Sequence, residues 1–140
     1  MNDTATPQPN PRYAWYVLTI LVIVYVLNFI DRQIISILAN DIKRDLGLTD
    51  GDLGFLYGTA FGVFYSLFGI PLGKLADGWT RTRLLTLGLS LWSVMTAASG
   101  FAKNGAMLAG ARIGVGIGEA TASPSAYSLL YDWFPKEKRA

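Results

Sequence analysis

Long apolar segments alternate with short polar segments along this chain. The apolar segments cover residues 13–38, 53–72, 84–102 and 107–134. Each reaches the ~20 residues that a helix needs to cross ~30 Å of hydrocarbon. A backbone in lipid must satisfy its own hydrogen bonds, and the segments lack the sustained alternation of membrane strands. The pattern therefore predicts four transmembrane helices.

The polar segments differ from one another. Residues 1–12, "MNDTATPQPNPR", are rich in proline, and we expect a disordered cytoplasmic tail. Residues 39–52 are a polar connection that ends in "TDGD", a typical helix start. Residues 73–83, "GKLADGWTRTR", form the second connection. The third connection, "KNGA" at 103–106, is so short that the third and fourth segments should form a tight helical hairpin.

The composition supports a membrane protein and excludes several functions. Hydrophobic residues make up 51% of the chain and charged residues only 16%, whereas a soluble domain has about 25% charged residues. Cysteine and histidine are both absent, so we expect no metal site, no cofactor and no enzyme. The formal net charge of +2 and the scattered basic residues argue against nucleic acid as a partner.

Basic residues indicate how the helices are oriented. More of them fall on the side of the N-terminus and the second connection than on the opposite side. By the positive-inside rule, we expect a multi-pass protein of the cell (inner) membrane with a cytoplasmic N-terminus. The first group contains Arg12, Lys74, Arg81, Arg83, Lys136, Lys138 and Arg139, and the second contains Lys43, Arg44 and Lys103.

Four charged residues fall inside the apolar segments, away from the segment ends. Arg112 and Glu119 are seven residues apart, so they project from nearly the same side of the fourth helix. Counting residues from the helix ends places Asp31 at a similar depth to Arg112, and Glu119 about 10 Å deeper. Charges in a membrane usually face a bundle interior or a wet cavity. We therefore predict a cluster of Asp31, Arg32, Arg112 and Glu119 on a cavity wall; the alternative for Asp31 and Arg32 is a pair at the headgroup boundary.

Glycines recur near these charges, but not in a phosphate-binding pattern. The run "GVGIGE" at 114–119 follows no predicted strand, and its glycines are out of register with G-x-G-x-x-G. Small residues spaced four apart instead predict surfaces for close helix packing. One such ridge contains Gly110, Gly114, Gly118 and Ala122, and the other contains Gly54, Gly58, Gly62 and Ser66.

Residues 73–85, "GKLADGWTRTRLL", resemble the signature loop between helices two and three of the major facilitator superfamily. That pattern is Gly-x-Leu-Ala-Asp-Arg-x-Gly-Arg-Lys. This sequence matches it at Gly73, Leu75, Asp77 and Arg81, and departs from it at Gly78, Thr80 and Thr82. "NFIDRQ", the second segment and "ARIGVGIGEATASPSAYSLLYDWFPKEKRA" are similar to the spinster-like branch of that superfamily.

The resemblance implies an all-α, polytopic membrane fold. Residues 13–140 would form helices one to four of an N-terminal six-helix bundle, and a C-terminal half of the same transporter would complete the cavity. It also implies a gating role for the loop that contains Gly73, Asp77 and Arg81. Without the other half, we do not expect this chain alone to transport.

The predicted function is secondary active transport by alternating access, coupled to protons. Asp31 or Glu119 would exchange an arginine for a proton, and Arg32 or Arg112 would hold an anionic substrate. The branch suggests an amphipathic anion such as a lysophospholipid or sphingoid lipid, and related branches suggest an organic or sugar acid. A non-transporting membrane scaffold is the alternative of another class. Most aromatic residues of the second helix are expected to face lipid: Phe55, Tyr57, Phe61, Phe64 and Tyr65.

Overall fold

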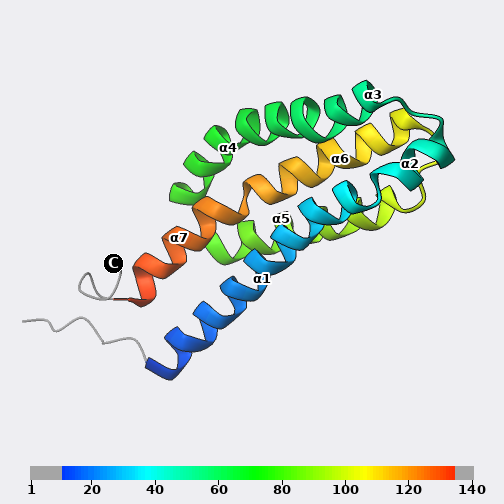
Figure 1. The fold of residues 1–140 in the computed structure, drawn as a ribbon. Coiled ribbons are helices and arrows are strands. Elements are labelled where there is room, and N and C mark those ends of the chain that lie inside the picture. The colour runs from blue at the N-terminus through cyan, green and yellow to red at the C-terminus, as the bar shows by residue number, and fades with distance from the viewer. Residues whose placement is uncertain (1–10, 135–140) are drawn as a thin grey trace, which may run out of the picture.

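The computed structural model describes residues 11–134, and these form helices without any strand. The long helices run side by side along one direction (Figure 1). The first and last described residues lie at the same end of this bundle. The elements are α1 (Pro11–Ile37), α2 (Ala39–Leu46), α3 (Asp50–Gly54), the π-helix η1 (Phe55–Ala60), α4 (Phe61–Gly78), α5 (Arg81–Ser99), α6 (Gly105–Ala120) and α7 (Ala122–Trp133).

The structure differs from the expected helices at their ends. The first helix begins at Pro11, so the last two residues of the expected tail at 1–12 are helical. Residues 1–10 lie outside the described residues. The polar connection at 39–52 contains the short helix α2, whose Ile42 and Leu46 pack on a small core around Leu53 and Leu108. Sequence hydrophobicity missed α2 because it is too short and too polar to cross a membrane.

The second and fourth apolar segments also contain interruptions. Residues 50–78 form one long helical stretch, within which η1 winds more widely than an α-helix. The expected helix at 107–134 is divided at Thr121. Pro124 explains this break, because it has no N–H for the carbonyl of Ala120 and its ring would clash with that carbonyl. Thr121 Oγ1 instead donates a 2.8 Å hydrogen bond to the carbonyl oxygen of Gly118.

Helix starts follow the expected capping chemistry. The backbone N–H of Asp52 donates to Thr49 Oγ1 at 3.2 Å, and the N–H of Thr49 donates to Asp52 Oδ2 at 2.9 Å. This reciprocal capping box confirms the helix start predicted from "TDGD". Asn104 caps α6 in the same manner, because its Oδ1 accepts a 2.8 Å hydrogen bond from the N–H of Met107.

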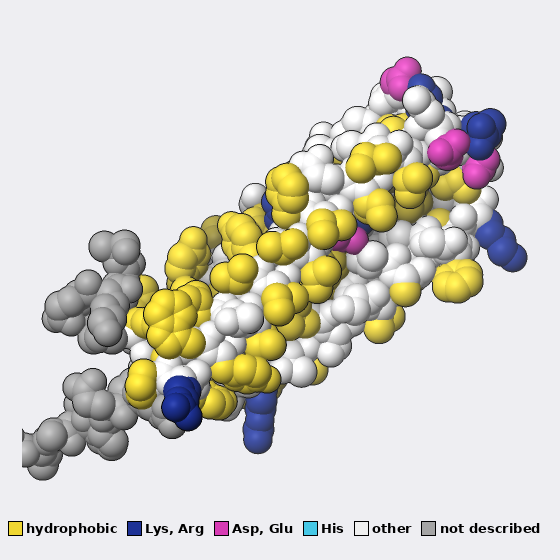
Figure 2. Space-filling model, turned by 60° about the horizontal axis from the view of Figure 1, so that its bottom comes forward, with side chains coloured by type: hydrophobic (Ala, Val, Ile, Leu, Met, Phe, Trp, Pro, Cys, Tyr) yellow, Lys and Arg dark blue, Asp and Glu magenta, His cyan; other side chains and the backbone are white. Residues whose placement is uncertain are grey.

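The outer surface matches a lipid environment. Two helical stretches, Pro11–Ile37 and Asp50–Gly78, are long and apolar enough to cross a membrane. Figure 2 shows hydrophobic side chains along the length of one face, with charged side chains gathered mainly at the two ends. Large apolar side chains of α1, including Trp15, Phe29 and Ile37, are exposed. α6 and α7 are each too short to count as a span because of the break at Thr121.

α6 lies between α4 and α5 and has the most extensive contacts with them (Figure 1). Its glycine ridge explains the close approach to α5. A Cβ at Gly118 would lie 2.8 Å from the carbonyl oxygen of Gly88 and 2.7 Å from the backbone nitrogen of Trp92, and a Cβ at Gly114 would meet the side chain of Met95. Gly110 belongs to the same predicted ridge but faces open space.

The ridge predicted on the second helix does not pack within the described residues. A Cβ on Gly54, Gly58 or Gly62 would meet no other atom within 4 Å. The helix instead buries a different face, which includes Leu53, Leu56 and Ala60. The packing predicted for these three glycines is therefore not made by any helix among the described residues.

Replacing Gly118 with alanine tests the contact between α5 and α6. The added methyl group would meet backbone atoms that cannot rotate away, so we expect a loss of about 1–3 kcal/mol in stability. Thermal unfolding of the intact transporter in detergent measures it. Gly110→Ala is the matched control, since it lies on the same helix in open space. Equal melting temperatures for the two variants would contradict the proposed close contact.

Candidate functional site

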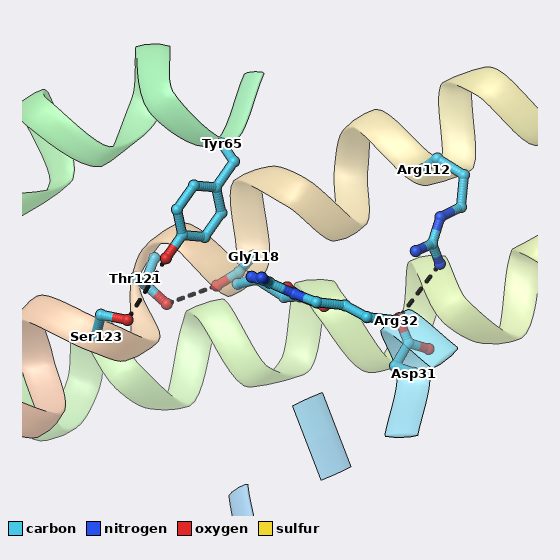
Figure 3. Close-up of polar contacts among 8 residues, drawn as sticks. Asp31, Arg32, Tyr65, Arg112, Gly118, Thr121 and Ser123 are labelled. Carbon is cyan, nitrogen blue, oxygen red and sulfur yellow. Dashed lines mark hydrogen bonds and ion pairs between the residues drawn. The ribbon is translucent and has the colours of Figure 1, made fainter. Parts of the chain in front are cut away.

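A buried ion pair joins α1 to α6. Arg112 Nη1 donates to Asp31 Oδ2 at 3.2 Å, as the dashed line in Figure 3 shows. The exposed fractions of the two side chains are only 4% and 7%. The similar depth that residue counting predicts for Asp31 and Arg112 thus agrees with their contact in the structure.

A second ion pair lies deeper along α6. Arg32 Nη2 and Nε both contact Glu119 Oε2, at 2.8 and 2.9 Å. The Glu119 side chain is completely buried, whereas the Arg32 side chain is 43% exposed. Oε1 of Glu119 has no partner with hydrogen-bond geometry among the described residues. Glu119 therefore retains one oxygen that is available to another partner.

Helix geometry explains why these residues form two pairs. Arg112 and Glu119 are two turns apart on one side of α6, which separates them by about 10 Å along its axis. Asp31 and Arg32 are consecutive on α1, so they point about 100° apart. Their side chains can therefore reach α6 at two different levels, and the four formal charges sum to zero.

Aromatic rings of α4 lie against the arginines. The guanidinium carbon of Arg32 is 5.0 Å from the ring centre of Phe61 and 5.3 Å from that of Tyr65. The two rings stack with their centres 5.8 Å apart. Phe61 and Tyr65 are thus exceptions to the expectation that most aromatic side chains of this helix face lipid. The sequence did not mark them as exceptions, because the position of Arg32 depends on how α1 packs.

A cavity of about 190 Å³ borders the Arg32–Glu119 pair. Polar groups at its wall include Asn28 and the hydroxyls of Tyr65 and Ser123, whose oxygens are 3.5 Å apart (Figure 3). Apolar and aromatic side chains complete the wall. The lining residues are Val24, Tyr25, Asn28, Phe29, Arg32, Tyr65, Glu119, Ala122 and Ser123.

A separate cavity of about 360 Å³ borders the Asp31–Arg112 pair, between α1, α2, α5 and α6. Asp45 of α2 adds a further carboxylate to its wall, and Thr96 adds a hydroxyl. Nε of Arg112 and Oγ1 of Thr96 are buried without a hydrogen-bond partner among the described residues. The two ion pairs thus face different cavities.

The signature loop lies at the end of the bundle near the described chain ends. Arg81, at the start of α5, forms an ion pair with Asp132 of α7. Asp77 is exposed in the last turn of α4 and has no ion-pair partner among residues 11–134. Arg81 thus pairs with Asp132 and not with Asp77 in this structure. Gly73, within α4, has open space around its Cα.

The described part of the chain gives no indication of a metal site. No group of three or more potential ligands among aspartate, glutamate, histidine and cysteine is found there. The two carboxylates of the buried cluster each have an arginine partner instead.

Most of the sequence matches the model of a known family. The family model of the Major Facilitator Superfamily matches residues 21–140. The chain belongs to the major facilitator superfamily. This confirms the all-helical membrane fold, and the members of this family are transporters rather than enzymes.

A solved structure supports the spinster-like resemblance. The chain superposes with a TM-score of 0.87 on a crystal structure of a bacterial homologue of the human lysosomal transporter spinster, in an inward-facing and unoccupied conformation. The two sequences are 40% identical, and the match covers 91% of this chain and 26% of the other.

Two transport proteins are also similar in sequence to this chain. An efflux pump of the same superfamily from Mycolicibacterium smegmatis is 36% identical over 131 residues, which are 94% of this chain and 30% of the pump. A probable L-galactonate transporter from Escherichia coli K12 is 34% identical over 114 residues, 81% of this chain and 25% of that protein. The chain thus spans about 25–30% of the length of these two relatives.

Sequence reasoning missed several residues around the charged cluster. Asn28 lies beside the carboxylate of Glu119, and Ser123 and Tyr65 contact each other at the cavity wall. Neutral polar residues are common in membrane helices, so the sequence alone did not indicate that these residues lie near the charged cluster. Asp132 was also missed, because an acidic residue near a helix end needs no special explanation.

Removing Asp31 tests the buried pair. Asp31→Asn would leave the Arg112 guanidinium buried without a counter-charge, and breaking a buried pair in this manner costs about 3–5 kcal/mol. We expect a clear drop in the melting temperature of the intact transporter. Asp41→Asn is the control, because it removes one partner of the exposed ion pair between Arg44 and Asp41 and should change little. If Asp31→Asn melts like the control, the buried pair does not stabilise the bundle.

Proposed function

We propose that this chain forms the charged wall of a secondary transporter that works by alternating access and couples an organic anion to protons. The observation that carries the proposal is the Arg32–Glu119 pair, in which a completely buried carboxylate and a half-exposed guanidinium border the same cavity. Ionisable groups inside a membrane protein commonly mark substrate paths and proton relays.

Glu119 is the proposed proton carrier. A proton on its carboxylate would remove the charge attraction to Arg32, and Oε1, for which no described residue meets hydrogen-bond geometry, offers a position for that proton. Asp31 remains the alternative carrier, but both the carboxylate and the guanidinium of its pair are buried, so separating them exposes a charge to the protein interior. Glu119 can therefore exchange its arginine partner for a proton at a lower cost in free energy than Asp31 can.

Arg32 is the proposed anchor for the substrate anion. A guanidinium offers a planar fork of donors that matches carboxylate and phosphate groups. Once Glu119 is neutral, the exposed part of Arg32 faces the cavity with an unbalanced positive charge. Arg112 is less suited to this role because its side chain is only 4% exposed.

Two substrate classes share the required anionic group. The aromatic and aliphatic wall residues Tyr25, Phe29 and Val24 favour an amphipathic anion such as a lysophospholipid or sphingoid lipid. The similarity to a probable L-galactonate transporter favours a sugar acid or another organic acid instead. Uptake of both classes into the same vesicles would distinguish them.

The proposed location is the cell (inner) membrane with a cytoplasmic N-terminus. Lys74, Arg81 and Arg83 surround the second connection, at the same end of the bundle as the start of α1 (Figure 1). An excess of lysine and arginine marks the cytoplasmic side of membrane proteins.

Gating is proposed for the loop that contains Gly73, Asp77 and Arg81. Exposed Asp77 would be able to contact a helix N-terminus of the remainder of the transporter, where a carboxylate is favourable. The ion pair of Arg81 with Asp132 would hold α5 and α7 together while the gate moves.

Glu119→Gln tests proton coupling in the intact transporter reconstituted into vesicles. Glutamine mimics the protonated acid and cannot release a proton. We expect uptake against a concentration gradient, driven by a pH gradient, to fall to the level seen without that gradient. Exchange of labelled for unlabelled substrate should continue. Unchanged pH-driven uptake would sink the coupling role of Glu119, and Asp41→Asn serves as the control that should behave like wild type.

A charge swap tests the gate. Arg81→Glu should place two acidic side chains together and slow transport, while the double variant Arg81→Glu with Asp132→Arg should recover much of the rate. Initial uptake rates, normalised to the amount of protein in the membrane, measure this. Failure of the swap to recover any transport, with both variants folded, would argue that the pairing itself is not what matters.

A further inference from the structure

One aromatic ring contacts the arginines of both ion pairs. The ring centre of Phe61 is 5.0 Å from the guanidinium carbon of Arg32 and 5.9 Å from that of Arg112. Both distances fall within the ~6 Å range of cation–π attraction. Phe61 is thus the described residue that links the Arg32–Glu119 pair to the Asp31–Arg112 pair.

Local structure fixes the position of this ring. Phe61 is the first residue of α4 and directly follows η1, whose wider turn sets the direction of the side chains that come after it. Gly116 of α6 leaves space for the ring, since a Cβ there would lie 3.4 Å from both Phe61 Cδ2 and the Phe61 carbonyl oxygen. Tyr65 supports the ring from the next turn by stacking on it.

The charged groups around the ring come from two helices. α1 contributes Asp31 and Arg32, and α6 contributes Arg112 and Glu119. The neighbouring residue of α4, Tyr65, offers a second ring to Arg32. Arg32 contacts the Glu119 carboxylate and the two rings, and only its contacts with the rings are independent of whether that carboxylate holds a proton.

We propose that Phe61 is a positioning residue that holds Arg32 at the cavity wall when Glu119 becomes protonated. This inference rests on the proposed function. Without Glu119 as a counter-ion, a long and half-exposed arginine side chain would otherwise sample many rotamers. The negative face of the Phe61 ring keeps the guanidinium in place for the arriving anion.

Fluorinated phenylalanines at position 61 test the attraction without changing the packing much. One, two and three fluorines progressively remove the negative charge from the ring face. We expect the melting temperature of the intact transporter to fall stepwise along this series. In the Arg32→Gln background the steps should shrink, because only the more distant Arg112 then remains over the ring.

The same series at Phe64 is the matched control. Phe64 lies on the same helix and stacks on Phe68, with ring centres 6.5 Å apart, and no arginine lies over either ring among the described residues. Fluorination there should leave the melting temperature unchanged. A flat series at position 61, or equal steps with and without Arg32, would overturn the positioning role.

Transport then separates this inference from the proposed function. With galactonate and a lysophospholipid as probes, we expect trifluorination at position 61 to raise KM about 5- to 30-fold with a smaller change in kcat. A change in kcat alone would overturn the positioning role. If wild type moves neither probe while the melting series still depends on Arg32, the proposed substrate classes fail and the contact of Phe61 with Arg32 stands.

Discussion

The cost of placing charge inside a membrane governs this structure. Ionised side chains at such depth cost several kcal/mol unless they find partners, and both arginines of the cluster find a carboxylate on a neighbouring helix. α1 approaches α4, α5 and α6 less closely than α6 approaches α4 and α5. Its long charged side chains cross that distance, so the position of α1 against α6 depends on two ion pairs more than on close backbone packing.

The frame that holds α6 in place is made differently. Glycines at 88 and 118 let the backbones of α5 and α6 meet directly, which suits helices that gain little from hydrophobic attraction in lipid. The charged residues project from the same helix toward α1. α6 thus has a close backbone contact with α5 on one side and ion pairs with α1 on the other. Alternating access would need this combination, because the helix must stay in place while its charged residues exchange partners.

The aromatic residues of α4 add a third kind of support. Phe61 and Tyr65 offer Arg32 an attraction that does not depend on protonation, whereas the bond to Glu119 does. A transporter that moves a proton must let one ion pair open, and the arginine must not be lost from the site when that happens. The wide turn of η1 lies directly before Phe61 and sets the direction in which its ring points. Such turns often occur at functional sites.

Much of this protein followed from the sequence alone. Apolar length and the distribution of basic residues determine a helical membrane fold, because lipid leaves the backbone few alternatives. Helical periodicity and depth also placed Asp31 beside Arg112, since both positions follow from residue counts. The tertiary structure decided what depends on neighbours: that Arg81 contacts Asp132 rather than Asp77, that Gly54, Gly58 and Gly62 face open space, and that Phe61 lies between two arginines. The spacing of glycines and the positions of aromatic residues in the sequence are compatible with contacts to several different helices. Only the packing of the helices determines which of these contacts form.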